Sequence, residues 1–205
     1  MSGIGATSTG PVIHVRPGRS TGWWGVVFMI VTESVLFGLL LFTYFYFRAG
    51  QGEWPPAGLP MPELRGSGIR TVVLLGSTFP LVWAERSLLK RGHVAKSAVW
   101  LFVTMAMAGV FLIGHVQEQF VLWEELAPTE TAYGSVLMTI LNFHAAHLVV
   151  GMLALAYSAV HLLRGRITQK QHSMLEISGM YWHFVDAIWV FVYSSLFLSP
   201  HLLGR

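Results

Sequence analysis

The sequence predicts an all-α integral membrane protein, built as a bundle of five transmembrane helices. Of its 205 residues, 54% are hydrophobic and 11% are charged, and the mean hydropathy is +0.58. Soluble domains carry about 25% charged residues. Most of the chain lies in charge-free runs, at 20–32, 34–47, 71–84, 97–117, 131–163, 177–185 and 187–204. Since one crossing needs about 20 apolar residues, these runs indicate repeated crossing of a bilayer.

The chain divides into a tail and a membrane domain. Residues 1–20 are expected to form a mobile N-terminal tail, because Gly, Ser, Thr and Pro dominate them and such residues bury too little apolar surface to offset the entropy of ordering. The membrane domain is assigned to 21–205. Its first helix, about 22–48, is too long for a signal-peptide core and has no small-residue cleavage site behind it.

The second predicted helix, about 69–90, contains Pro80 and the adjacent charges Glu85 and Arg86. Snorkelling of Arg86 would let this short apolar stretch span the membrane. The remaining helices are expected at about 97–117, 133–163 and 172–200.

The connections between helices differ in composition. Residues 51–68 are rich in Pro and Gly, which argues against regular helix there. Residues 118–130 are predicted to form an acidic loop. Aromatic residues at the predicted helix ends are expected to form an interfacial belt; these are Trp23, Trp24, Trp54, Trp123 and Tyr133.

The basic residues predict the orientation of the bundle. Nine Lys and Arg residues fall on one side of the predicted membrane and four on the other. By the positive-inside rule the N-terminus is cytoplasmic and, after an odd number of spans, the C-terminus is outside. The nine are Arg16, Arg19, Arg86, Lys90, Arg91, Lys96, Arg164, Arg166 and Lys170; the four are Arg48, Arg65, Arg70 and Arg205.

The composition also excludes several classes of site. Without cysteine the chain cannot form disulfides, thiolate-held zinc sites or iron–sulfur clusters. Its formal net charge of +3 comes from 13 Lys and Arg residues scattered between apolar runs, without the dense basic face that a phosphate backbone requires. We therefore expect membrane lipids as partners, and no nucleic acid.

Two carboxyl side chains, Glu33 and Asp186, fall well inside predicted spans. An ionisable group at the bilayer centre costs about 2.5–3.5 kcal/mol to insert, and it needs a partner. We favour Glu33 as a protonated acid that is hydrogen-bonded to a neighbouring His or Tyr. The alternative is a proton-relay carboxyl, although relays usually contain chains of acids and histidines.

Polar and small residues recur every three or four positions along the last two predicted helices, and this spacing places each set on one helix face. Such stripes should face protein, so we favour hydrogen bonding between helices as their role. The alternative is haem or metal ligation by His144 or His147 together with His183, as in a free-standing haem-binding electron carrier. The stripes are His144, His147, Gly151, Ala154, Ser158 and His161, then His172, Glu176, Gly179, His183 and Asp186.

Three segments carry a family resemblance. The first is 24–48 (WGVVFMIVTESVLFGLLLFTYFYFR), which contains Glu33. The second is YGS at 133–135 followed by NFHAAH at 142–147, and the third runs from His172 through Glu176 to YWHFVD at 181–186 and Trp189. In order and spacing they resemble subunit III of the haem–copper respiratory oxidases (cytochrome c oxidase subunit III), in its five-helix bacterial form. Glu33 stands at the position of that family's intramembrane acid.

The resemblance implies a subunit without catalytic residues, metal or redox cofactor of its own, whose partner subunits hold haem and copper. Its main contact would be oxidase subunit I, with subunit II and other respiratory-complex subunits as further partners, in a prokaryotic plasma (inner) membrane. It would support proton uptake and protect the catalytic subunit during turnover. Cytochrome c is favoured over quinol as electron donor. Alternatives are quinol oxidase subunit III and the related accessory protein of nitric oxide reductase.

The resemblance also implies functional polar residues and a lipid site. Glu33 is expected to pack against His144, His147 or His183 as a hydrogen-bonded pair, and Asp186 is the second intramembrane acid. The family holds phospholipid in a cleft, and basic residues at the cytoplasmic end suit lipid phosphate. The lipid-binding candidates are Arg164, Arg166, Lys170, His172, Glu176 and Trp182.

Overall fold

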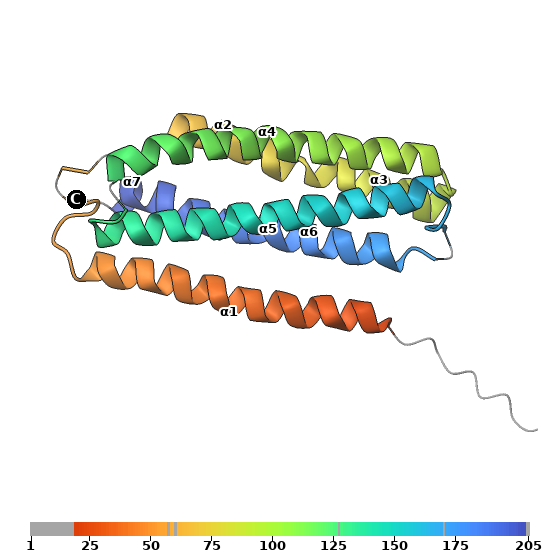
Figure 1. Cartoon of the computed structure of the whole chain (residues 1–205), viewed down its shortest axis with the longest axis horizontal. Helices are drawn as coiled ribbons and strands as arrows, with labels where there is room; N and C mark the ends of the chain where they lie inside the picture. The colour runs from red at the N-terminus through yellow and green to blue at the C-terminus, as the bar shows by residue number, and fades with distance from the viewer. Residues whose placement is uncertain (1–18, 57, 60, 127, 170, 204–205) are drawn as a thin grey trace, which may run out of the picture.

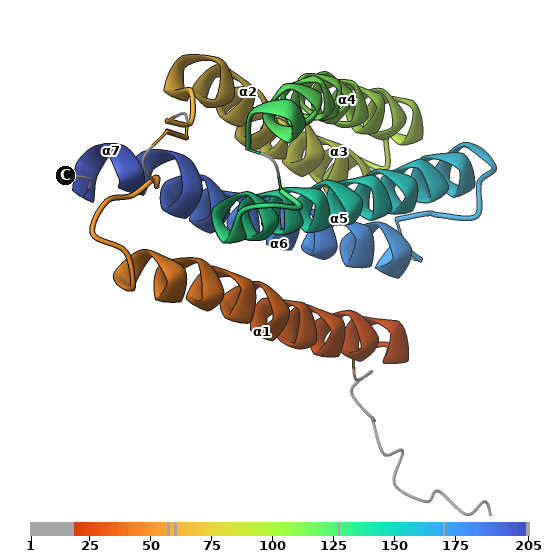
Figure 2. The same ribbon diagram turned by 60° about the vertical axis from the view of Figure 1, so that its left-hand side comes forward.

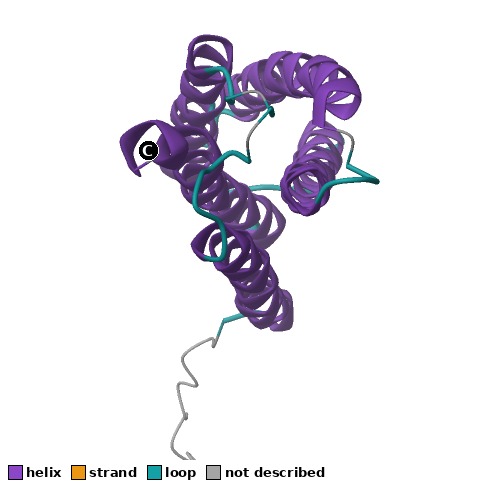
Figure 3. Ribbon diagram, turned by 90° about the vertical axis from the view of Figure 1, so that its left-hand side faces the viewer, coloured by secondary structure: helices purple, strands orange, loops and turns teal. Residues whose placement is uncertain are grey.

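The computed structural model describes residues 19–56, 58–59, 61–126, 128–169 and 171–203. Most of the predicted tail and the candidate Lys170 therefore lie outside the described residues. The described part is helical without strands (Figure 3). It contains 5 helical segments that are long and apolar enough to cross a membrane: Thr21–Ala49, Leu64–Arg91, Val94–Leu126, Ala132–Leu163 and Ser173–Leu202. The predicted all-α bundle of five spans is confirmed.

The second and fifth crossings are subdivided. The helices are α1 (Thr21–Ala49), α2 (Leu64–Gly76), α3 (Thr78–Arg91), α4 (Val94–Leu126), α5 (Ala132–Leu163), α6 (Ser173–Tyr193), the π-helical turn η1 (Ser194–Leu198) and α7 (Ser199–Leu203). The break between α2 and α3 falls at Ser77. Pro80 explains it, because proline has no N–H to donate to the carbonyl of Gly76 one turn earlier.

Two predicted boundaries are wrong. The expected acidic loop at 118–130 is helical as far as Leu126, because α4 continues past the last apolar turn. At 1.5 Å per residue its 33 residues span roughly 50 Å, longer than a hydrocarbon core of about 30 Å. Helix also begins at Leu64, inside the region expected to be irregular. There Gly68 allows α2 to approach α6, since a Cβ at this position would lie 3.1 Å from the Tyr193 hydroxyl.

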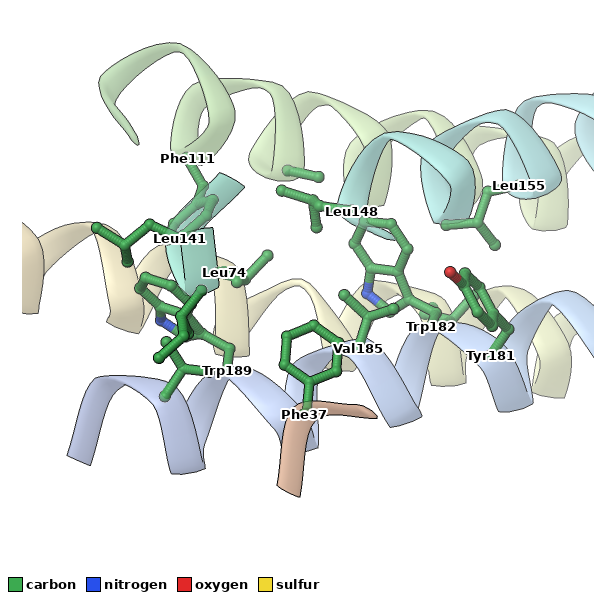
Figure 4. Close-up of a cluster of buried hydrophobic side chains, with 14 of the residues drawn as sticks. Phe37, Leu74, Phe111, Leu141, Leu148, Leu155, Tyr181, Trp182, Val185 and Trp189 are labelled. Carbon is green, nitrogen blue, oxygen red and sulfur yellow. The ribbon is translucent and has the colours of Figure 1, made fainter. Parts of the chain in front are cut away.

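In the bundle, α5 and α6 lie between α1 on one side and the group α2, α3 and α4 on the other (Figures 1 and 2). The start of α1, the α3–α4 turn and the α5–α6 loop lie at one end, whereas α7 lies at the opposite end (Figure 1). The side chains that fill the centre come from all five crossings (Figure 4). They include Phe37, Leu74, Phe111, Leu141, Leu148, Val185, Trp182 and Trp189.

The Pro-rich loop after α1 is docked by Trp54. Its indole N–H donates a 2.8 Å hydrogen bond to the Tyr44 hydroxyl, and its ring meets Tyr133 edge to face, with centroids 4.9 Å apart. Both Trp54 and Tyr133 are buried. Their expected place in an interfacial belt is therefore wrong, because the loop folds back over the ends of α1 and α5.

Gly134 makes the tight start of α5 possible, and we expect Gly134→Ala to destabilise the chain by about 1–3 kcal/mol, as overpacking does. A Cβ there would lie 2.6 Å from the Leu126 carbonyl oxygen and 3.1 Å from the Pro128 Cα, both backbone atoms. The matched control is Gly38→Ala, where a Cβ meets nothing within 4 Å. Detergent-induced unfolding of the full chain, followed by circular dichroism, measures both free energies; equal effects would contradict this account.

Candidate functional site

Glu33 of α1 and His147 of α5 form a polar pair inside the predicted membrane. The carboxyl Oε2 lies 2.9 Å from His147 Nε2. Of the three histidines expected as partners of Glu33, the structure joins it to His147. The pair links α1 to α5 by a hydrogen bond in a part of the chain where neither group can rely on water.

The second nitrogen of His147 determines how protons are shared in this pair. Nδ1 lies 2.7 Å from the Phe143 carbonyl oxygen, one turn back in α5. A carbonyl oxygen only accepts hydrogen bonds, so Nδ1 carries a hydrogen. A single further proton then lies between Nε2 and the carboxyl, either as neutral imidazole with carboxylic acid or as imidazolium with carboxylate. The pair has the same total charge in both forms.

The surroundings of the pair are apolar but not closed. Phe37, one turn after Glu33, packs edge to face on the His147 ring with centroids 5.1 Å apart. From α6, the Tyr181 hydroxyl donates a 3.4 Å hydrogen bond to the His147 carbonyl oxygen. The side chains of Glu33 and His147 remain 28% and 16% exposed within this chain. Part of each side chain therefore lies at the outer surface of this bundle.

His144 lies elsewhere, in the centre of the bundle. It is fully buried, its ring packs on Trp189 with centroids 4.5 Å apart, and Phe111 stands perpendicular to it. Neither ring nitrogen has a hydrogen-bond partner among the described residues. His144 and His147 are separated because three residues turn a helix to a position about 60° away.

Three side chains of α6 form hydrogen bonds to α2 and to the break between α2 and α3. The indole N–H groups of Trp182 and Trp189 donate to Ser77 Oγ and Thr71 Oγ1, at 3.2 and 3.0 Å. Asp186 Oδ2 accepts from Thr78 Oγ1 at 2.6 Å. Because these α6 residues are spaced by four and three, one helix face makes all three contacts.

His183 does not join this network. It is half-buried, and it forms no side-chain hydrogen bond to the described residues. No hydrogen bond joins His183 to Asp186, which lies one turn later in α6, because the carboxyl of Asp186 turns towards Thr78. Across the described residues, no group of three or more His, Cys, Asp or Glu side chains is arranged to hold a metal ion.

The partly buried ion pair between Arg70 of α2 and Glu118 of α4 was not predicted from the sequence. Their nearest atoms, Nη2 and Oε2, lie 2.5 Å apart, in a close charge contact rather than an aligned hydrogen bond. Gly114 makes room for Arg70, because a Cβ there would lie 2.6 Å from the Arg70 Cδ. A glycine one turn before an acid, opposite a lone arginine, was the available signal; assigning Glu118 to a loop concealed it.

The lipid-binding candidates separate into exposed and buried residues. Arg164 and Arg166 are exposed after the end of α5, and His172 is half-buried before α6. Glu176 is engaged with Arg19 at 3.3 Å. The prediction that Trp182 contacts lipid is wrong, because its ring is fully buried against Gly151 and its N–H donates a hydrogen bond to Ser77.

A profile of the cytochrome c oxidase subunit III family matches residues 7–200, nearly the whole chain. The chain belongs to this family. Cytochrome c oxidase subunit 3 of Synechocystis is 30% identical over 177 residues, covering 85% of this chain and 74% of the relative. The Thermostichus vulcanus protein of the same name is 30% identical over 175 residues, covering 85% of both chains. The mouse protein is 29% identical over 182 residues, covering 85% of this chain and 68% of the relative.

Membership of the subunit III family gives the quoted motifs a structural meaning in this chain. The glycine of the YGS segment is Gly134, which makes room for the tight start of α5. The two histidines of the NFHAAH segment are one packing residue, His144, and one partner of the intramembrane acid, His147. The YWHFVD segment places Trp182 and Asp186 against the α2–α3 break.

We expect the shared proton of the pair to lie on the Glu33 carboxyl, because the neutral form avoids separating charges in a low-dielectric medium. Infrared spectra of Glu33→Gln should then lack one carboxylic-acid C=O stretch of the wild type. His147→Phe should keep that band but move it, since the hydrogen bond is lost. The control Glu53→Gln, at an exposed loop position, should change nothing. An unchanged C=O region in Glu33→Gln would mean that the pair is ionic.

Proposed function

We propose that this chain is the non-redox subunit III of a proton-pumping cytochrome c oxidase, embedded beside catalytic subunit I. In this role it stabilises the catalytic subunit and supports its proton uptake, and no electron passes through it. The observation that carries the proposal is the match to the subunit III family over 7–200, together with the Glu33–His147 pair at the position of the family's acid.

A prokaryotic plasma membrane, with the N-terminus in the cytoplasm, fits the arrangement of charge. Four basic residues belong to the last turns of α3 and the first turn of α4, and two follow α5; these segments lie at the end of the bundle where α1 begins (Figure 1). The positive-inside rule assigns such an end to the cytoplasm. The cyanobacterial relatives are consistent with this location. The four are Arg86, Lys90, Arg91 and Lys96, and the two are Arg164 and Arg166.

Support of proton uptake follows from what the pair can do chemically. It holds one proton between a carboxyl oxygen and an imidazole nitrogen, and both side chains are partly exposed. Intramembrane acids and histidines of this kind serve as proton-exchanging groups in membrane proteins. Glu33 would accept a proton from outside the chain and return it, while His147 holds the carboxyl in place.

Two further roles, stabilisation of a partner subunit and binding of lipid, are proposed from the residues on the outer surface of the bundle. Only Phe37 and Tyr44 of α1 are buried in the described bundle, so most of this helix is available to lipid or to another subunit. Arg164, Arg166 and His172 remain the proposed contacts for a phospholipid phosphate, because cationic and hydrogen-bonding side chains at a membrane surface attract anionic headgroups.

Purification tests the assignment to an oxidase. The tagged chain, extracted from its native membrane in mild detergent, should bring with it a haem–copper subunit I and cytochrome c oxidase activity, identified by mass spectrometry and by oxygen consumption. Recovery with the catalytic subunit of nitric oxide reductase, or with a quinol oxidase, would contradict the assignment. A Soret band in the isolated chain would instead support a haem-binding electron carrier.

The role of Glu33 is tested in the assembled complex. Oxidase that contains Glu33→Gln should begin turnover at a rate near that of the wild type and then lose activity several-fold sooner, because proton uptake fails under sustained turnover. Oxygen consumption recorded over many turnovers measures the loss. Glu130→Gln, an exposed acid in the α4–α5 loop, is the matched control. Equal lifetimes for the Glu33 variant and the control would refute a role in proton uptake.

A further inference from the structure

We propose that the α3–α4 connection forms a second lipid site, which binds the phosphate headgroup of an anionic phospholipid. A pocket of about 790 Å³ opens between the last turns of α3 and the first turns of α4. It lies on different helices from the Glu33–His147 pair and from the candidates around α5 and α6. Its lining residues are Trp83, Arg86, Ser87, Lys90, Arg91, Ala95, Lys96, Val99 and Trp100.

The turn between the two helices fixes the shape of the pocket. Gly92 adopts a left-handed conformation, with φ of 62°. Its N–H bonds to the Leu88 carbonyl oxygen at 2.9 Å, and the His93 N–H bonds to the Ser87 carbonyl oxygen at 3.0 Å. This pattern ends α3 sharply, and it allows α4 to run back beside α3. The basic residues of the two helices are thereby brought to one opening.

All the charged residues that line the pocket are positive. Arg86, Lys90, Arg91 and Lys96 line it, and no Asp or Glu does. None of the four forms an ion pair with the described residues. All four are exposed. Unneutralised cations grouped at the end of membrane-spanning helices favour an anionic phosphate group, whose charge and acceptor oxygens they can satisfy.

The lining residues further from the α3–α4 turn are apolar, and this favours a lipid over free phosphate. The rings of Trp83 and Trp100 are 4.9 Å apart at an angle of 60°. Trp83 and Val99 are 47% and 58% exposed. One turn further into the predicted membrane, Phe79 and Val103 continue the same two helix faces, and both are exposed. A headgroup at the basic rim would therefore place its acyl chains along an apolar surface, beside tryptophans of the kind found at membrane interfaces.

The test uses the full-length chain reconstituted in phosphatidylcholine vesicles that carry a small fraction of photoactivatable phosphatidylglycerol. Crosslinked peptides should map to residues 83–100. Lys90→Gln/Lys96→Gln should weaken this labelling about 25-fold in apparent affinity, because each basic residue near the surface contributes a factor of about five. Lys90→Arg/Lys96→Arg should restore it. Circular dichroism of each variant establishes that the helices are intact.

The matched control is Arg164→Gln/Arg166→Gln, which removes the same charge at the same end of the bundle. It should leave the labelling of 83–100 unchanged. An equal loss in the control and in the pocket variant would show general surface attraction and overturn the proposal. Equal labelling by photoactivatable phosphatidylcholine would overturn it as well. Complete competition by glycerol 3-phosphate would identify a soluble-phosphate site instead of a lipid site.

Discussion

Polar groups inside the membrane are costly unless they find partners on the protein, and three such hydrogen bonds fix how α6 packs. The α2–α3 break lies where Pro80 interrupts the helical hydrogen bonds. Ser77 and Thr78 present hydroxyl groups at this break, and Thr71 presents a third from within α2. Trp182, Asp186 and Trp189 meet those hydroxyls from one face of α6. Hydrogen bonds between membrane helices average about 0.6 kcal/mol, so the three together contribute about 2 kcal/mol. Their larger effect is on register, because sliding α6 by one residue would break all of them.

The same constraint gives a different result at α1. This helix contributes only two buried residues to the described bundle, so apolar packing holds it less than the other crossings. Polar contacts add to this packing at different depths, and one of them joins Arg48 Nη1 to Ser199 Oγ of α7 at 2.7 Å. Glu33 bonds to His147 within the span, and Tyr44 accepts from Trp54, whose loop closes over the helix end. The helix that carries Glu33 is thus positioned by hydrogen bonds together with partly buried apolar side chains.

Much of the architecture could be predicted from the sequence, because charge-free runs report directly on the length of each crossing. The prediction failed where charged residues belong to helix. Glu118 lies in α4 rather than in a loop, since a helix continues beyond the bilayer wherever its backbone hydrogen bonds persist. The Glu118–Arg70 pair was hidden by the same error.

The candidate site was predicted only to the level of residue type. Spacing identified polar stripes on two helices, and the family resemblance added Glu33 with three histidines as alternative partners. It could not distinguish His144 from His147, because both lie near one face and the choice depends on how α5 is rotated against α1. Likewise, Asp186 could have met His183 or Thr78, and only the position of the α2–α3 break decides between them.

The hydrogen bond from His147 Nδ1 to the Phe143 carbonyl oxygen limits the route by which a proton could enter and leave the pair. An imidazole conducts when it receives a proton at one nitrogen and releases it from the other. Here the second nitrogen donates to a backbone carbonyl oxygen. That oxygen does not take up the proton, and it has none of its own to give back. Any proton that this pair took up would therefore have to leave again through the Glu33 carboxyl, so the pair could store a proton but could not pass it on along α5.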